Sequence, residues 1–316
     1  MKINYLLLAS NPLGFRRLTS RLSDKNVSIY VHVDLKAELG EFELELSGFS
    51  NIKFIQDREN VIWGDISMVK ATLNLMNEVK KDNNGDSYNV LMSESDYPVK
   101  SKEFIKNYLQ KNYGDIFLTS IHIDNAWRKS MVKNRLNEYT IHPVPTKRSY
   151  ISIDFYSLRL QSVKRTIKNC FFLYRNKRFD VILKALKRRN FPSYLTAYGG
   201  SQWWALPTDV LNFVLDFLEK HPSYIEYHQF THIPDEIFFH SIISSNFPKS
   251  RIRPSSTYVN WKRKGCTLPV TFSKSDLDEL KNTDCLYARK FDQETSSELL
   301  DSIDKELLNT TMYEVH

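Results

Sequence analysis

Short apolar segments alternate with helical stretches along the first 120 residues, and this alternation constrains the fold of the chain more than any other feature. The apolar segments have the length and composition of buried strands, and they cover residues 3–9, 27–33, 51–56, 88–92 and 115–119. Apolar residues at helical spacing fall between them, in residues 15–22, 66–79 and 101–112. Strands that alternate with helices predict an α/β fold, with a mostly parallel central sheet and helices on both faces.

A parallel sheet also predicts where a ligand binds, because ligands on such sheets lie at the carboxyl ends of the strands. Asp34 directly follows the apolar segment 27–33. The loop SESDYP at 93–98 directly follows the segment 88–92. We therefore expect both to lie at the binding edge of the sheet.

The composition is that of a globular protein, with 41% hydrophobic and 26% charged residues. No apolar run approaches the ~18–20 residues of a membrane span, and the longest near the start, Tyr5–Ala9, is too short for a secretory signal. Cys170, Cys266 and Cys285 are scattered and form no C-x-x-C pair. This pattern is typical of reduced thiols and predicts a cytoplasmic protein.

Positive charge is concentrated in residues 147–189. This segment holds 13 Lys and Arg against Asp154 and Asp180, a net +11, so the rest of the chain carries −4 of the total +7. The segment also contains several aromatic residues, and three interpretations are open. It can be a solvated helical hairpin, a surface that lies against anionic lipid, or a nucleic-acid contact, although no nucleic-acid motif accompanies the charge.

The stretch THIPDEIFF at 231–239 places two acids ahead of an apolar run. Pro234 suits the first position of a helix, so Asp235 and Glu236 fall in its first turn, near free N–H groups and the positive end of the helix dipole. Favourable electrostatics alone can explain such acids. A zinc site with His228 and His232 is a further alternative, but four-residue spacing brings two histidines together only on a helix, and Pro234 predicts that the helix begins after them.

Six stretches, in order along the chain, resemble the core-2/I-branching β-1,6-N-acetylglucosaminyltransferases, which share a family with the peptide O-xylosyltransferases. The stretches span almost the whole chain: IYVHVDLKAE (29–38), VIWGDISMVKATLNLM (61–76), YNVLMSESDYPVKS (88–101), GGSQWWALPTDVLNFVL (199–215), THIPDEIFFHSII (231–243) and LYARKFD (286–292).

The resemblance implies a GT-A type fold and an inverting transferase that uses a UDP-sugar, with UDP-GlcNAc as the first candidate donor and UDP-xylose as the second. Such a reaction needs a base for the acceptor hydroxyl and a positive charge for the departing diphosphate. By resemblance, Glu236 is the base and Lys290 is the phosphate-binding lysine, with Arg289 beside it. Arg263 and Lys264 match a second phosphate contact of the family only approximately.

The family is known for working without a metal ion, so no cofactor is expected. The Asp-x-Asp triplet of many GT-A enzymes has no counterpart at the expected strand end, where this chain has Glu94-Ser95-Asp96. The only D-x-D is Asp276–Asp278, which reads as a helix start. A metal at Glu94 and Asp96 remains an open alternative.

The resemblance also implies further contacts. We expect the donor to meet Arg58, Trp63, Asp34, Asp96 and Ser201. We expect the acceptor to meet Asp235, Trp204, Tyr258 and Trp261, because aromatic faces stack on sugar rings. Core packing is the alternative for each aromatic residue, and for Trp203 as well.

We predict one GT-A domain over residues 1–316, with a nucleotide-binding half at 1–120, a basic helical insertion at 121–190 and an acceptor and catalytic half at 191–316. The animal members of the family carry an amino-terminal anchor and disulfides, which this sequence does not show, so we expect a bacterial cytoplasmic relative. Its acceptor is expected to be a saccharide or glycolipid, reached at the inner face of the membrane through residues 147–189. A non-catalytic protein that binds glycans or membranes is the alternative from another class.

Overall fold

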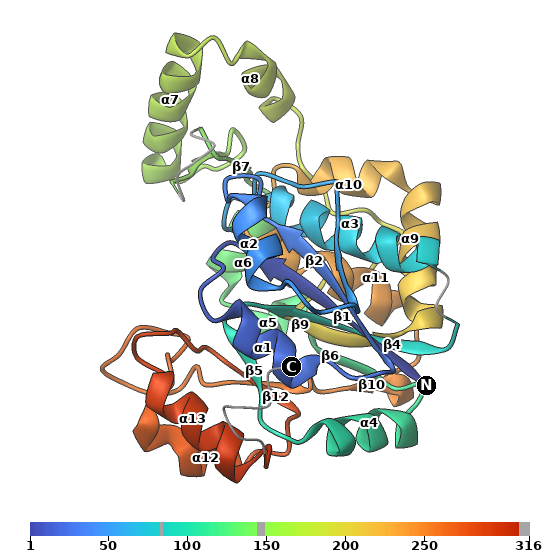
Figure 1. The fold of residues 1–316 in the computed structure, drawn as a ribbon. Coiled ribbons are helices and arrows are strands. Elements are labelled where there is room, and N and C mark those ends of the chain that lie inside the picture. Colours follow the sequence, from blue (N-terminus) through green and yellow to red (C-terminus); the bar gives the residue numbers. More distant parts are fainter. Residues whose placement is uncertain (83–84, 144–148, 310–316) are drawn as a thin grey trace.

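The computed structural model describes residues 1–82, 85–143 and 149–309. Within these residues, seven strands form the central sheet in the order β10-β6-β9-β4-β1-β2-β3 (Figure 1). All neighbours are parallel except β9, which runs antiparallel to both β4 and β6. The strands are β1 (Lys2–Ala9), β2 (Val27–Val33), β3 (Ile52–Phe54), β4 (Ser87–Ser93), β6 (Ile116–His122), β9 (Tyr198–Pro207) and β10 (Ile252–Arg253).

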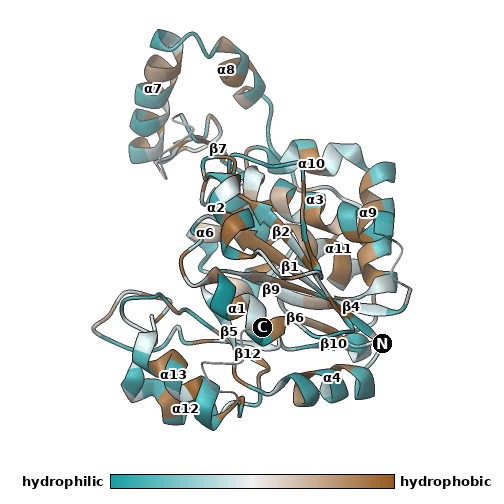
Figure 2. Cartoon of the chain, in the orientation of Figure 1, coloured by the Kyte–Doolittle hydropathy of each residue, from teal (hydrophilic) through white to brown (hydrophobic). Residues whose placement is uncertain are grey.

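Helices cover both faces of the sheet, and the predicted mostly parallel α/β fold is confirmed. Alternate residues of β1 face opposite sides, because side chains alternate along a strand. Tyr5 and Leu7 pack with one group of helices, which consists of α1 (Phe15–Leu22), α2 (Leu39–Glu45) and α4 (Lys102–Lys111). Leu6 packs with the other group, which consists of α3 (Ile66–Asp82), α9 (Thr208–Lys220) and α11 (Phe238–Asn246). Figure 2 shows the strands and the inward helix faces as the hydrophobic part of the body.

The sequence predicts a polar cap at the start of two helices, Asp65 or Ser67 for α3 and Thr208 for α9. Asp65 accepts a hydrogen bond from the backbone N–H of Ser67 and so caps the start of α3. Thr208 is the first residue of α9, but its hydroxyl hydrogen-bonds to Ser87 and Gly85, so the predicted cap is wrong.

A smaller sheet brings the end of the chain to the loop after β4. Its order is β11-β12-β5, with β11 at Thr257–Val259, β12 at Tyr287–Arg289 and β5 at Asp96–Pro98. Arg289 is paired directly with Asp96 in the antiparallel register. The helices α12 (Leu277–Lys281) and α13 (Ser297–Glu306) lie beside this sheet (Figure 1).

The described part of the basic segment, residues 149–189, belongs to an arm that projects from the body at the top of Figure 1. It consists of a two-stranded sheet, β7 (Tyr139–Ile141) with β8 (Ile151–Ile153), and two helices, α7 (Leu160–Arg175) and α8 (Phe179–Ala185). Two short helices precede it, α5 (Ile123–Ala126) and α6 (Lys129–Leu136), and α10 (Pro222–His228) lies in the body below it.

The strand β9 links the two halves of the chain at the ligand-binding edge of the sheet. Val90 of β4 is paired with Ala205 of β9, so the antiparallel register brings the first half of β9 level with the carboxyl end of β4. Residues 199–203 therefore lie at the edge where a parallel sheet binds its ligands.

Candidate active site

The acids Asp235 and Glu236 lie in a short turn ahead of a helix. Pro234–Glu236 form a single 3₁₀ turn, η1, and α11 begins only at Phe238. The prediction that Pro234 opens an α-helix is therefore wrong by one turn. Ile233 precedes the turn with φ 52°, a left-handed conformation that is strained for a β-branched residue. Its backbone N–H donates to the carbonyl of Gly64 at 2.9 Å, which fixes the turn against the loop that leads into α3.

Glu236 is held by an arginine that the sequence did not predict. Arg135 on α6 donates from Nη1 to Oε2 of Glu236 at 2.7 Å. The guanidinium lies 3.9 Å from the ring centroid of Trp127, and this stacking fixes its plane. Trp127 in turn packs on β9 at Gly199, where an added Cβ would lie 2.3 Å from the indole ring. The Glu236 carboxylate thus has a fixed orientation while its side chain stays 26% exposed.

Asp235 has a different environment although it is the next residue. Its carboxylate is buried, and Oδ1 has no hydrogen-bond partner. Burial, with a smaller effect from the charge of Glu236, raises the pKa of Asp235 to about 7. Since its side chain is buried, the prediction that Asp235 contacts the acceptor is wrong for this conformation.

A second ion pair lies at the end of β4. Arg289 donates from Nη1 to both carboxylate oxygens of Asp96 at 3.1 Å, and the backbone N–H of Ser93 donates to Oδ2 of Asp96 at 2.6 Å. The guanidinium lies 3.9 Å from the ring centroid of Trp203 on β9. The Asp96 side chain is 0% exposed, so it positions Arg289 and cannot touch a donor as predicted.

Lys290 follows this pair and stays available. Its backbone N–H donates to Val270, and the next residue, Phe291, donates to the carbonyl of Ser95. Lys290 is therefore fixed beside the loop after β4, with a half-exposed side chain. Among the ion pairs of the described residues, none involves its ammonium group.

The predicted base and the predicted cation lie at one edge of the sheet. Glu236 is connected to Gly199 of β9 through Arg135 and Trp127, and Lys290 is next to Arg289, which stacks on Trp203 of the same strand. Gly199 and Trp203 are four residues apart, a rise of about 13 Å along a strand. Glu236 and Lys290 are thus both connected, through these side chains, to the first half of β9.

The residues predicted for the donor lie at the same edge but differ in what they offer. The guanidinium of Arg58 donates to the carbonyls of Val33, Asp34 and Ala37, so it shapes the loop after β2. The Asp34 carboxylate accepts from the Lys36 ammonium at 2.8 Å. Ser201 contacts the His240 ring through its backbone carbonyl.

Trp63 extends the site toward the η1 turn. It is 47% exposed, and its ring lies edge-on to His232 at 6.4 Å between centroids. Tyr150 of the arm also contacts His232, with 4.2 Å between the two ring centroids. The sequence did not predict this aromatic group, because its members come from three distant segments.

The residues predicted for sugar stacking differ in how exposed their rings are. Trp204 is 1% exposed and packs edge-on against Phe239, so its predicted contact with the acceptor is wrong: it is a core residue. Tyr258 stacks on Phe272, and its hydroxyl donates to Glu279. Trp261 is 54% exposed and can offer a free ring face.

The acids that could hold a metal are engaged elsewhere. Asp276 caps its turn with Ser273 and pairs with Arg263 at 2.7 Å, so the D-x-D triplet is structural. Asp96 is held by Arg289, and Glu94 accepts from Ser10, with its pKa raised by burial. No group of three His, Cys, Asp or Glu side chains within the described ranges has the geometry of a metal site.

The two histidines of the zinc alternative do not form a site. His228 is buried among aromatic rings at the end of α10, which lowers its pKa well below the usual value. His232 lies beyond the end of that helix. The four-residue spacing therefore does not bring the two rings together on one helix.

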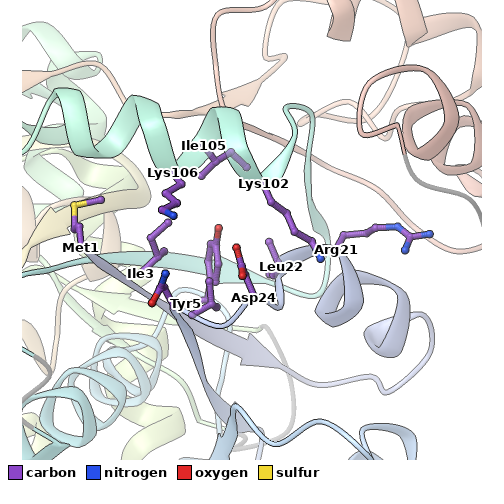
Figure 3. Close-up of a pocket in the computed structure, with 11 residues that line it drawn as sticks. Met1, Ile3, Tyr5, Arg21, Leu22, Asp24, Lys102, Ile105 and Lys106 are labelled. Atoms are coloured by element: carbon purple, nitrogen blue, oxygen red, sulfur yellow. The ribbon is translucent and has the colours of Figure 1, made fainter. Parts of the chain in front are cut away.

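Two hollows lie away from the residues above. One, at the amino-terminal ends of β1 and β2, is lined by Ile3, Tyr5 and Lys102 among others, and its volume of about 10 Å³ is far too small for a sugar (Figure 3). The other, of about 590 Å³, lies between α6 and the start of α7. Polar and basic side chains line it, among them Lys129, Lys133, Glu138, Arg159 and Arg165.

The α/β sheet with its polar carboxyl edge is the architecture of GT-A type glycosyltransferases. A family profile described as core-2/I-branching enzyme matches residues 3–282, and the chain belongs to this family. The expected family is thereby confirmed.

Curated relatives are similar at low identity. A xylosyltransferase of Ciona intestinalis is 24% identical over 92% of this chain and 32% of its own length. Xylosyltransferase 2 of Homo sapiens is 22% identical over 96% of this chain and 33% of its own length. The Drosophila melanogaster xylosyltransferase oxt is 25% identical over 83% of this chain and 28% of its own length. The chain spans about a third of the length of these relatives. In the part of the chain that the structure describes, no helix is long and apolar enough to cross a membrane.

Proposed function

We propose that the protein is an inverting glycosyltransferase that moves a sugar from a UDP-sugar to a hydroxyl of a saccharide acceptor. The observation that carries the proposal is the arrangement at the carboxyl edge of the sheet. In a chain of this family, a carboxylate with a fixed orientation, Glu236, is connected to the first half of β9 through Arg135 and Trp127, and an available ammonium, Lys290, follows Arg289, which stacks on Trp203 of the same strand.

The proposed reaction is a single displacement at the anomeric carbon. The acceptor oxygen forms a bond to this carbon while the bond to the diphosphate oxygen breaks, and the proton of the acceptor hydroxyl passes to Glu236. Arg135 holds the carboxylate in place for this transfer. Lys290 stabilises the negative charge that develops on the leaving UDP, so no metal ion is needed for this role.

The donor is proposed to be UDP-GlcNAc. UDP-xylose is the second candidate, because the relatives of Ciona, Homo sapiens and Drosophila are xylosyltransferases. Trp63, with its exposed ring beside His232, is proposed to contact the donor, together with Arg289. Trp261 is proposed to stack on the acceptor.

The acceptor is proposed to be part of a surface-glycan precursor in a bacterial cell. The basic segment 147–189 would hold the enzyme at the inner face of the membrane, where such a precursor is carried on lipid. The hollow between α6 and α7 lies on the helix that carries Arg135, and this side is proposed for the approach of the acceptor.

The test is release of UDP from a panel of UDP-sugars, first by slow donor hydrolysis and then with saccharide acceptors. We expect Glu236→Gln to lower turnover by about 10²–10⁴ while donor affinity stays similar, because only proton transfer is lost. Glu226→Gln, an exposed glutamate on α10, is the matched control and should act like wild type.

Lys290→Ala should weaken both UDP binding and turnover, whereas Lys249→Ala, at an exposed lysine with no proposed role, should not. Normal turnover of Glu236→Gln would refute the role of the base. Absence of UDP release with every donor, from a protein that still binds glycans, would instead favour the non-catalytic alternative.

A further inference from the structure

The helix α7 has an apolar face that the rest of the protein leaves uncovered. Its residues are spaced by three or four positions, as on one side of a helix, and they are 38–68% exposed. They are Leu160, Val163, Ile167, Phe171 and Tyr174.

This face is additional to the face that α7 buries. Leu173, Thr166 and Asn169 are buried on another side of the helix, and Leu173 packs with Val181 and Ala185 of α8 in the small core of the arm. At 100° per residue, the exposed apolar face spans about 80° of the helix and lies about 120° from the buried face. The arm therefore keeps its own core and still presents apolar side chains to solvent.

The exposed face continues onto α8. Tyr174 of α7 contacts Phe179 of α8, with ring centroids 5.3 Å apart. Phe179, Leu183 and Leu186 repeat the helical spacing and are all exposed. We call the exposed apolar residues of both helices the apolar stripe; the two helices form the upper part of the projecting arm (Figure 1, Figure 2).

Basic side chains border the apolar stripe. Lys164, Lys168 and Arg175 lie at about 40–80° from Leu160 around the helix axis, directly beside the stripe. Residues 159–188 hold 10 Lys and Arg against one acid, Asp180. Of these bases, Arg165 is paired with Glu138 and Arg178 with Asp180, and the three beside the stripe take part in no ion pair within the described residues.

We propose that the apolar stripe of α7 and α8 inserts into the interface of an anionic lipid membrane, with the flanking lysines and arginines on the headgroups. An apolar face beside a strongly basic face is the pattern of helices that lie in the plane of a membrane interface. The proposal goes beyond electrostatic attraction of the basic segment, and it does not depend on the transferase activity. A second copy of the chain is an unfavourable occupant, since it would bring two strongly positive arms together.

The test is flotation with phosphatidylcholine vesicles that contain or lack phosphatidylglycerol, at low and at physiological salt. We expect wild type to float with the anionic vesicles at both salt concentrations. The variant Leu160→Gln/Ile167→Gln/Phe171→Gln removes three large apolar side chains of the apolar stripe but keeps all charges, and glutamine is a good helix former. Its partition coefficient should fall about 100-fold, because three partly inserted side chains are lost.

A matched control replaces three other exposed apolar side chains, outside the arm, in the variant Leu44→Gln/Phe104→Gln/Leu268→Gln. It should float like wild type. Neutralising Lys164, Lys168 and Arg175 should lower binding about fivefold for each charge. Circular dichroism and UDP release with a soluble acceptor should be unchanged in all variants, which separates this proposal from the proposed function.

Three outcomes would overturn the proposal. The first is failure of wild type to float with anionic vesicles at physiological salt. The second is binding of the stripe variant as tight as that of wild type, which would leave only electrostatic attraction. The third is a wild-type dimer in sedimentation that the stripe variant loses, which would identify the stripe as an interface between copies.

Discussion

Replacing Asp235 by asparagine should change how the stability of the protein depends on pH. Asp235 is buried, Oδ1 has no hydrogen-bond partner, and burial raises its pKa from 3.8 to about 7. In the unfolded chain the same group keeps its ordinary pKa. Between these two values the folded protein therefore holds a proton that the unfolded chain has released.

The sign follows from proton binding. Where the folded state binds more protons, the free energy of unfolding falls as the pH rises. Asp235 is therefore most favourable to folding at low pH, and the loss of stability that its ionisation causes reaches its full size above pH ~7. A difference of about three pKa units corresponds to about 4 kcal/mol over the whole window. About 2 kcal/mol of this falls between about pH 5.5 and about pH 8.

Asparagine has no proton to lose, so the free energy of unfolding of Asp235→Asn should not fall in this way. The difference in the free energy of unfolding between the variant and wild type should therefore shift by about 2 kcal/mol in favour of the variant between the two pH values. The new amide N–H group can cost about 1–3 kcal/mol if it stays unpaired, but this cost is the same at both pH values.

The measurement is urea unfolding at both pH values, followed by the fluorescence of the 5 tryptophans. Asp57→Asn, at an exposed position, is the control and should follow wild type at both. Glu236→Gln should lower the pKa of Asp235, since the charge of Glu236 raises it, and should therefore weaken the pH dependence of stability. An equal stability difference between Asp235→Asn and wild type at both pH values would refute the reasoning.

Three further predictions concern the site and the core. Arg135→Met should lower turnover about 100-fold with little change in the KM of the donor, because Glu236 loses the hydrogen bond that orients it, and Arg135→Lys should restore part of the loss. Trp204→Ala should cost about 3–5 kcal/mol in the free energy of urea unfolding, whereas Trp261→Ala should leave stability unchanged and raise the KM of the acceptor. UDP release should persist in EDTA, and a loss that Mn²⁺ restores would assign the cation role to a metal at Glu94 and Asp96 rather than to Lys290.

The part of the fold that local patterns encode could be predicted. The strands β1 and β2 and the start of α3 follow from apolar periodicity and from a cap at Asp65, which depend on neighbouring residues. The mostly parallel sheet followed as well, and with it the carboxyl edge where Asp34 and the loop after β4 lie. These features need no knowledge of distant contacts.

The residues around Glu236 depend on distant contacts and could not be predicted in the same way. Arg135 is 101 residues away from Glu236 in the chain. One sign was present, because Val132, Arg135 and Leu136 share the side of α6 that faces the protein, where an arginine needs a partner. Trp203 and Trp204 depend on distant contacts too: both are buried in the core cluster with residues of α3, α9 and α11, so the exposed ring that was expected for Trp204 is not available.

The geometry of η1 explains why two neighbouring acids have different states. A 3₁₀ helix has three residues per turn, so consecutive side chains point about 120° apart, and only one of the two acids can face the interior. Asp235 takes that position, while Glu236 meets Arg135 and solvent. Below pH ~7 Asp235 is neutral and leaves the charge of Arg135 to Glu236, whereas above it a second negative charge competes for the same guanidinium. The turnover rate of wild type should therefore fall above about pH 7, whereas that of Asp235→Asn should not. Identical pH–rate profiles would show that the ionisation of Asp235 has no effect on Glu236 as the base.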